Sequence, residues 1–226
     1  MRKVHLLGLA VATALALSAC TEGEPEGTPT PSASVETAAT PYLPVPSGVE
    51  LTRPGSQLNV GDHAVVAYEP RQDLVGVLDI QVVRLEKASI KDFSAWQLTE
   101  QQKKSTPYYV RSRIENVGDT DLGGRPVPLY IVNEKNVLLE ATPFASSFEP
   151  CPSTPFPKKF GPGKTTRSCL VYLAPNRGQL EAVSFRPEES FNPITWDGDI
   201  EKYQPPKPEK PKKGKKSKNS NKSKNR

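Results

Sequence analysis

The chain has 226 residues, of which 35% are hydrophobic and 24% are charged, and its formal net charge is +5. This charge is unevenly divided: residues 205–226 carry +9, the first three residues carry +2, and residues 20–204 carry −6. The basic character therefore belongs to the C-terminus and not to the central part of the chain. Because the N-terminus also has the pattern of an export signal, nucleic acid is excluded as an expected partner.

Residues 1–19 have the pattern of a secretory signal peptide. Arg2 and Lys3 precede an apolar run over residues 6–17, which ends in small residues. A basic head, a short apolar middle and a small-residue exit are typical of secretory signals. The apolar run is shorter than the about 20 residues that a permanent transmembrane helix needs. We therefore expect the leader to be removed and the chain to be exported.

The exit site, Leu17, Ser18, Ala19 and Cys20, resembles the lipobox of bacterial lipoproteins. In that family the cysteine sulfur receives a diacylglycerol, and cleavage leaves this cysteine as the first residue of the mature chain. The resemblance implies cleavage after Ala19, acyl chains such as palmitate on Cys20, and attachment to the outer face of the cell membrane. Two or more acyl chains are sufficient for stable anchoring. The alternative is an ordinary cleaved signal whose mature chain happens to begin near a cysteine.

The cysteine count supports this interpretation. The chain has three cysteines, and lipidation of Cys20 leaves Cys151 and Cys169, which can pair as oxidising compartments favour. Chain entropy gives about 3 kcal/mol for a loop of this length, and less here because prolines already stiffen it. A redox or nucleophilic thiol would need a nearby base or a CxxC spacing, and neither is apparent. We expect a structural disulfide.

The segments on either side of the central part are expected to be disordered. Residues 20–48 are rich in Thr, Pro, Ser, Ala and Glu, and we interpret them as a linker that spaces the domain from the membrane. Residues 204–226 form a lysine-rich tail without aromatic residues or an amphipathic pattern. We expect it to contact anionic lipid or wall polymer; the alternative is a solubilising tail without a partner. Its contact residues are predicted to be Lys207, Lys210, Lys212, Lys213, Lys215, Lys216 and Lys218.

Residues 49–203 show short apolar runs with period-two alternation, separated by turn residues. We expect strands over residues 64–68, 78–82, 108–114, 128–132, 137–139, 169–173 and 180–185, and a last edge strand over 194–196. Residues 133–136 should join two of them as a hairpin, and residues 99–104 are the best helical candidate. Trp96 is expected to fill a core. Seven or eight short strands predict an all-β fold, an Ig-like antiparallel β-sandwich.

Two stretches carry a resemblance to a known type of domain. The turn Asn116-Val117-Gly118 after a strand, and residues 160–164 before Cys169-Leu170-Val171-Tyr172, resemble Ig-like extracellular domains of actinobacterial cell-envelope lipoproteins, of the immunoprotective-antigen type. The resemblance implies a β-sandwich in a Gram-positive envelope. Many such families have no assigned activity, and a fold does not by itself specify a function.

Residues that could carry chemistry are few. His63 is the one histidine left after the leader, and no G-x-S-x-G motif accompanies it. Asp119 and Asp121 could bind calcium with backbone carbonyls, although solvated turn acids are commoner. We therefore expect no enzyme activity, no metal and no cofactor, and predict a binding domain for an unidentified protein or ligand. The alternatives are an envelope hydrolase with an unrecognised carboxylate site, and a small-ligand or metal-binding lipoprotein serving a transporter.

Overall fold

The computed structural model describes residues 41–206. The leader with its cleavage motif, Cys20, most of the predicted linker and all the tail lysines named above lie outside the described residues. In residues 41–206, no helix is long and apolar enough to cross a bilayer.

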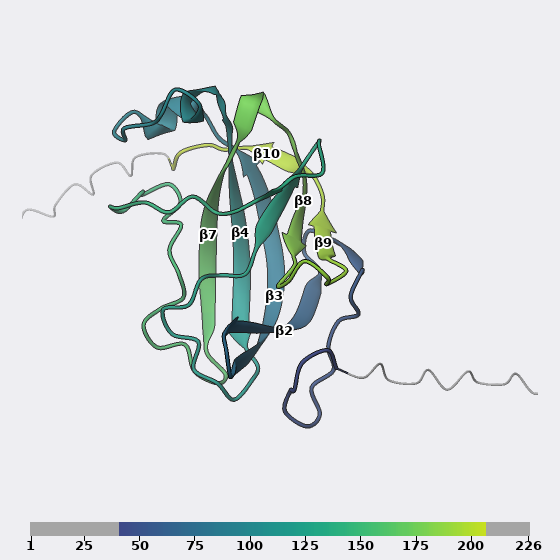
Figure 1. Cartoon of the computed structure of the whole chain (residues 1–226). Coiled ribbons are helices and arrows are strands. Elements are labelled where there is room, and N and C mark those ends of the chain that lie inside the picture. The colour runs from purple at the N-terminus through teal and green to yellow at the C-terminus, as the bar shows by residue number, and fades with distance from the viewer. Residues whose placement is uncertain (1–40, 207–226) are drawn as a thin grey trace, which may run out of the picture. The chain divides into compact units, whose positions relative to one another are not determined.

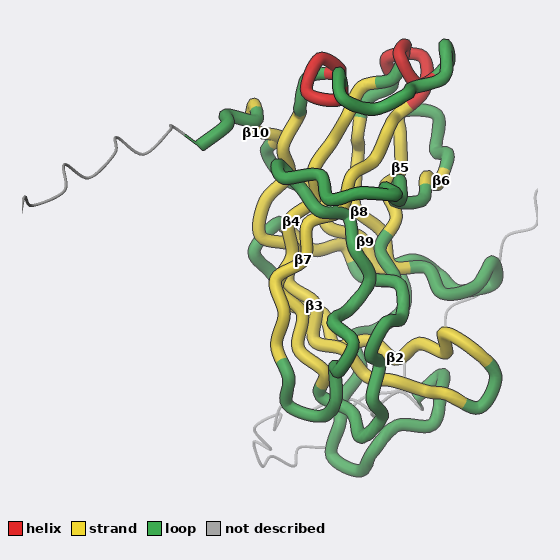
Figure 2. The backbone as a smooth tube through the Cα atoms, turned by 90° about the vertical axis from the view of Figure 1, so that its left-hand side faces the viewer, coloured by secondary structure: helices red, strands yellow, loops and turns green. Residues whose placement is uncertain are grey.

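The described residues form ten strands and three single-turn 3₁₀ helices, and Figure 1 shows how they are arranged. The strands are β1 (Gln57–Asn59), β2 (His63–Arg71), β3 (Leu74–Lys87), β4 (Thr106–Asn116), β5 (Tyr130–Asn133), β6 (Leu138–Leu139), β7 (Thr165–Ala174), β8 (Leu180–Phe185), β9 (Ile194–Asp197) and β10 (Ile200–Lys202). The helical turns are η1 (Ile90–Phe93), η2 (Gln102–Lys104) and η3 (Pro175–Arg177), which gather at one end of the strands (Figure 2).

The strands form two sheets. Sheet A has the order β1-β9-β8-β5-β6, and sheet B has the order β10-β3-β4-β7, with β2 also paired to β3. The long strand β3 has two partners on one edge, because β2 pairs with residues 74–81 and β10 with residues 85–87. The two-sheet, all-β sandwich is confirmed.

Three details differ from the sequence-based expectation. The described part has ten strands instead of seven or eight, and the pairs β1–β9 and β10–β3 are parallel. The segment 194–196 is not an edge, because β9 lies between β1 and β8. The two extra strands are three residues long, with the sequences QLN and IEK, and such short segments show no readable alternation. The predicted hairpin over residues 133–136 does join β5 to β6.

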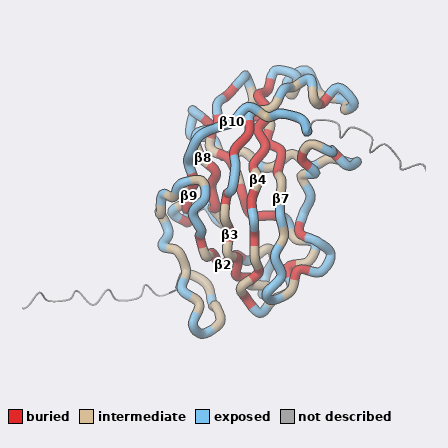
Figure 3. The backbone as a smooth tube through the Cα atoms, turned by 180° about the vertical axis from the view of Figure 1, so that it is seen from behind, coloured by how far each residue is buried: buried red, intermediate tan, exposed pale blue. Residues whose placement is uncertain are grey.

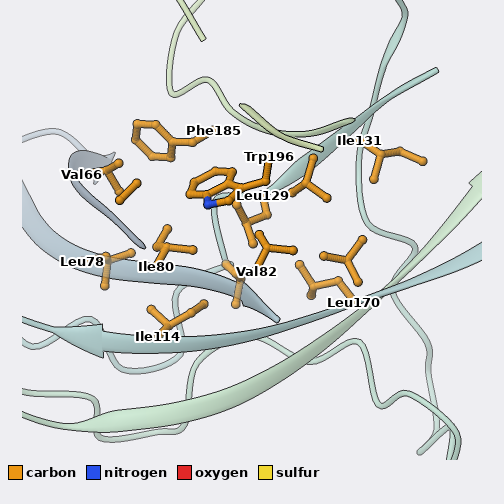
Figure 4. Packing of buried hydrophobic residues seen from close by; sticks show 14 of the residues in the cluster. Val66, Leu78, Ile80, Val82, Ile114, Leu129, Ile131, Leu170, Phe185 and Trp196 are labelled. Carbon is orange, nitrogen blue, oxygen red and sulfur yellow. The ribbon is translucent and has the colours of Figure 1, made fainter. Parts of the chain in front are cut away.

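The main core fills the space between the sheets. Trp196 of β9 is fully buried and lies beside Phe185 and Leu129, facing Ile80 and Val82 of β3 (Figure 4). Its indole Nε1 donates to the carbonyl oxygen of Asp62 at 3.1 Å, so the buried polar group is satisfied. This apolar layer makes the inward faces of both sheets unavailable to a ligand and leaves the outward faces.

The stretches that carried the family resemblance meet in a buried link at one end of sheet B. The Asn116 side-chain Nδ2 donates to the carbonyl oxygens of Thr120 and Phe160, both at 2.7 Å. The Asn116 Oδ1 accepts from the backbone N–H of Gly118. A Cβ at Gly118 would lie 2.9 Å from the Val77 nitrogen, so glycine is required by close packing. The turn after β4 and the loop before β7 are thus fixed together.

Two observations bear on segments outside the strands. Tyr42, within the predicted linker, packs on the core: its hydroxyl donates to the Ala67 carbonyl at 2.9 Å, and its ring meets Phe191 edge-on. The predicted helix over residues 99–104 is reduced to the single turn η2. The Thr99 hydroxyl accepts from the backbone N–H of Gln102, so residues 99–104 form a single capped turn.

Candidate functional site

The outer face of sheet B gathers both aromatic and charged side chains. On β4, Tyr108, Val110 and Ile114 belong to the core between the sheets, and alternation along the strand turns Tyr109, Arg111 and Arg113 to the other side. In Figure 3, β4 and β7 are mostly buried toward the end that lies near β10, and intermediate or exposed residues become frequent toward their other end. The outer face therefore has two halves.

One half is an aromatic cluster, defined here as Phe93, Trp96, Tyr109, Phe144, Phe148 and Tyr203. Phe148 is fully buried at its centre, with ring-centroid distances of 4.6 Å to Phe93, 4.9 Å to Trp96 and 5.1 Å to Phe144. Ser89 and Asp92 form a capping box at the start of η1, which fixes the turn that carries Phe93. Trp96, which was expected to fill a core, is partly buried and packs against this cluster on the outside of sheet B. Loops cover this half.

Two polar atoms inside the aromatic cluster lack partners. Neither the Tyr109 hydroxyl nor the Trp96 Nε1 has a hydrogen-bond partner among the described residues, although both are buried. Burial raises the pKa of Tyr109 well above its ordinary value of 10. The cluster is therefore stabilised by apolar packing while it carries an unfavourable buried hydroxyl.

The other half is an arginine groove, defined here by Arg84, Arg111, Arg113 and Arg167 together with Val83, Pro152 and Thr154. Strand register brings the arginines together, because Arg84 lies opposite Arg111 and Arg113 lies opposite Arg167. The groove has a volume of about 640 Å³. Every charged side chain that lines it is an arginine. The described residues 41–206 carry a formal charge of −2, so this is a local concentration of positive charge.

The four arginines are not equivalent. Arg111 Nε donates to Glu86 Oε2 at 2.6 Å, and Arg111 Nη2 donates to the Pro150 carbonyl at 3.0 Å. Glu86 is 6% exposed and also faces Arg84 Nε at 3.6 Å. Arg113 and Arg167 are exposed and make no hydrogen bond or ion pair within residues 41–206. Glu86 thus fixes the Arg111 side of the groove. On the other side, the guanidinium groups of Arg113 and Arg167 are unpaired within residues 41–206.

The predicted disulfide Cys151–Cys169 is confirmed and forms one wall of the groove. Its S–S distance is 2.00 Å, and Cys169 lies opposite Arg111 in the sheet. The loop after Cys151 is held further, since the backbone N–H of Ser153 donates to the Cys169 carbonyl and the Ser153 hydroxyl donates to the Thr142 carbonyl, both at 2.9 Å. Pro152 and Thr154 are therefore positioned along β7 by covalent and hydrogen bonds.

A smaller groove of about 350 Å³ adjoins the first and shares Gln81 and Arg113 with it. It contains His63, whose Nδ1 lies 2.8 Å from Asp79 Oδ1. Within the described residues the His63 ring makes no hydrogen bond to a hydroxyl, so no Ser-His-Asp arrangement is formed there. The histidine is half exposed at the edge of the sheet. Its contact with Asp79 therefore contributes little to the stability of the fold.

The turn acids considered as calcium ligands have structural surroundings. Asp121 Oδ1 accepts from the backbone N–H groups of Phe160 and Gly123, both at 2.8 Å, and these bonds lower the pKa of the Asp121 carboxyl. Asp119 is exposed. Across residues 41–206, no group of three or more His, Cys, Asp or Glu residues is placed to hold a metal ion. Asp121 therefore acts as a link between two loops.

Comparison with known proteins does not assign the chain to a family. No protein-family model matches the chain, and no curated protein matches it. Among solved structures, the secreted Mycobacterium tuberculosis protein MPT63 is similar, with a TM-score of 0.44 and 9% identity over 63% of this chain and 96% of that one. This similarity is too distant to transfer residues, a ligand or an activity. Lipidation of Cys20 stays a prediction.

Proposed function

We propose that this chain is a non-catalytic, extracytoplasmic lipoprotein of a Gram-positive envelope, anchored through Cys20, which presents its Ig-like β-sandwich to a protein or ligand. The observation that carries the proposal is the bond between Cys151 and Cys169. It accounts for two of the three cysteines and leaves Cys20, at the end of the lipobox-like motif, for acylation. Structural disulfides persist in oxidising compartments, which agrees with export.

The arginine groove supports a binding role over hydrolysis. Its lining contains neither a carboxylate nor a histidine, so it offers hydrogen-bond donors and positive charge but no general base. In this proposal the lysine-rich tail contacts anionic lipid or wall polymer, and the linker sets the distance of the domain from the membrane. The proposal includes no nucleic acid partner, because it places the chain outside the cytoplasm.

Metabolic labelling with an alkyne-tagged fatty acid tests the anchor. The full chain should incorporate the label in a bacterium that processes lipoproteins, and Cys20→Ala should remove the label and release the protein from the membrane fraction. The matched control is Cys151→Ala/Cys169→Ala, which should keep the label. Label retained in Cys20→Ala, or a reduced cytosolic protein, would overturn the proposed location.

Crosslinking in intact cells tests the binding role. The full chain should capture partners, and a chain that ends at Tyr203 should lose those that depend on the tail. Identical partners for the two chains would refute the role of the tail. Failure of both chains to capture any partner would count against the binding domain itself.

A further inference from the structure

We propose that the arginine groove is a binding site for phosphate esters, which it holds between Arg113 and Arg167. The inference rests on the proposed function, since it names the ligand chemistry of a domain that we place among envelope components. It starts from strand register: Arg113 of β4 and Arg167 of β7 are directly opposite each other on the same face of sheet B. Side chains at such positions have Cβ atoms about 4.5–5.5 Å apart.

Two like charges directly opposite each other destabilise a sheet. Here neither arginine has a hydrogen-bond or ion-pair partner among the described residues, and both are exposed. Arg84 and Arg111 occupy neighbouring positions and share one acid, Glu86, so the three side chains together keep a single positive charge. The acids Asp79 and Glu115 line the adjoining groove, beyond Arg113. An anion placed between Arg113 and Arg167 would remove the repulsion and supply acceptors for both guanidinium groups. The unliganded groove is therefore arranged for a negative ligand.

The groove is also built in advance of binding. Glu86 and the Pro150 carbonyl hold the Arg111 guanidinium in one orientation. Along β7, the disulfide and the hydrogen bonds of Ser153 hold Pro152 and Thr154. A rigid wall and a fixed arginine reduce the entropy that binding must overcome.

Size and geometry favour a phosphate ester over a single carboxylate. A volume of about 640 Å³ is within the roughly 300–1,000 Å³ range of small-molecule sites. It is therefore large enough for a ligand that extends beyond a bare ion. Guanidinium forks match phosphate oxygens in bidentate pairs, and a phosphate group can bridge two forks at once. Phosphodiesters occur both in soluble wall polymers and in phospholipid head groups, and the groove chemistry suits both sources.

Calorimetric titration of the chain spanning residues 20–226 with inorganic tripolyphosphate tests the site. We expect Arg113→Gln/Arg167→Gln to lower the affinity by about tenfold or more, because two charge-assisted contacts are lost. The control Lys158→Gln/Lys159→Gln removes the same charge from exposed positions outside the groove and should stay within about twofold. Tricarballylate, a tricarboxylate, should bind more weakly than tripolyphosphate to the unmodified chain.

Two further measurements locate the ligand. In NMR spectra, tripolyphosphate should shift the Nε–H signals of Arg113 and Arg167 and the amide signals of β4 and β7. Arg113→Lys/Arg167→Lys keeps the charge but not the fork, so it should bind with intermediate affinity and also serves if the glutamine variant fails to fold. Equal binding by the glutamine variant and its control, or shifts confined to the lysine-rich tail, would overturn the proposal.

The source of the phosphate is tested in two parallel experiments with the same variants. A soluble glycerol-phosphate oligomer represents the wall polymer, and vesicles of phosphatidylglycerol and phosphatidylcholine represent the lipid surface. Loss of binding by Arg113→Gln/Arg167→Gln with either ligand supports the site and assigns its source. No loss with either ligand refutes it. Fatty-acid labelling of Cys20 is independent of these results, so failure of the groove and failure of the anchor are distinguishable.

Discussion

The aromatic cluster and the arginine groove occupy the same face of the same strands, yet they have opposite properties. On β4, Tyr109 is fully buried, and Arg113, only four positions further along the strand, is exposed. What differs is the loop above each half. Phe93 and Trp96 from one loop and Phe144 and Phe148 from another cover Tyr109, whereas the disulfide-held loop after Cys151 borders the arginines and leaves the groove between them open. The cover therefore decides whether a sheet face becomes a core or a site.

The largest expected effect is the loss of the ring at the centre of the aromatic cluster. Phe148→Ala should lower the free energy of unfolding by about 3–5 kcal/mol, because it removes a fully buried ring that packs on four others. Urea denaturation measures this change. Phe144→Ala is the matched control and should cost less, since Phe144 is half-buried. If the two halves are independent, folded Phe148→Ala should bind tripolyphosphate normally; a large loss of affinity would show that they are coupled.

Removal of the disulfide should affect both halves. Cys151→Ala/Cys169→Ala should lower the free energy of unfolding by about 2–3 kcal/mol, because the unfolded chain gains freedom in a loop that prolines already restrict. The wall of the groove also loses its covalent link, so affinity for tripolyphosphate should fall. Denaturation and titration of the same variant measure the two effects. Unchanged stability would contradict a structural role for the bond.

Glu86→Gln should lower the free energy of unfolding, because it removes the counter-charge of Arg111 in the arginine half. Glu86 is 6% exposed and accepts from Arg111 at 2.6 Å, so its replacement leaves a partly buried guanidinium without its counter-charge. We expect a loss of about 2 kcal/mol in urea denaturation. Glu115→Gln is the control on the same sheet. The one side-chain hydrogen bond of Glu115 within the described residues is a long one, of 3.4 Å from Thr165, so its effect should be within about 0.5 kcal/mol.

Tyr109→Phe should stabilise the protein by about 1 kcal/mol, because it removes a buried hydroxyl that has no partner among the described residues. The control is Tyr172→Phe, which should destabilise, since the Tyr172 hydroxyl donates to the Leu129 carbonyl at 2.7 Å. Thermal unfolding at neutral pH compares the two variants. A loss of stability in Tyr109→Phe would reveal a partner for the hydroxyl.

The buried Tyr109 also predicts that the protein loses stability at alkaline pH. Burial raises the pKa of Tyr109 above its ordinary value of 10, so the folded state binds the phenolic proton more tightly than the unfolded state. This contribution is fully present below about pH 10 and is lost as the pH rises above that value. Thermal unfolding between pH 7 and pH 11 should show the decline, and Tyr109→Phe should reduce it. The arginine half should not contribute, because guanidinium groups stay protonated.

The smallest expected change in stability comes from Arg113→Gln/Arg167→Gln. Both side chains are exposed and repel each other across two strands, so the variant should unfold within about 0.5 kcal/mol of the parent, on the stable side. Urea denaturation at low salt gives the sharpest comparison, since salt screens the repulsion. A large destabilisation would mean that the arginines hold the fold together and would remove the reason for treating them as a site.

Much of the fold could be predicted from local pattern. The alternation in residues 108–114 and 180–185 identified β4 and β8, and the turn residues at 133–136 identified a hairpin, because both signals depend on neighbours in the chain. The parallel strands β1 and β10 could not be predicted. Each has only three residues, and these residues form a strand because they pair with partners far along the chain. Their pairing is a tertiary effect.

The sequence alone determined the unequal distribution of charge, the alternation that produces a two-sheet sandwich, and a pair of cysteines free to join. These are properties of composition and short-range spacing. Only the tertiary structure decided that Arg113 faces Arg167, that Glu86 neutralises Arg111, and which half of sheet B is covered. The physical reason is register: Arg113 and Arg167 are far apart in the chain, and they become neighbours only when β4 and β7 pair residue by residue.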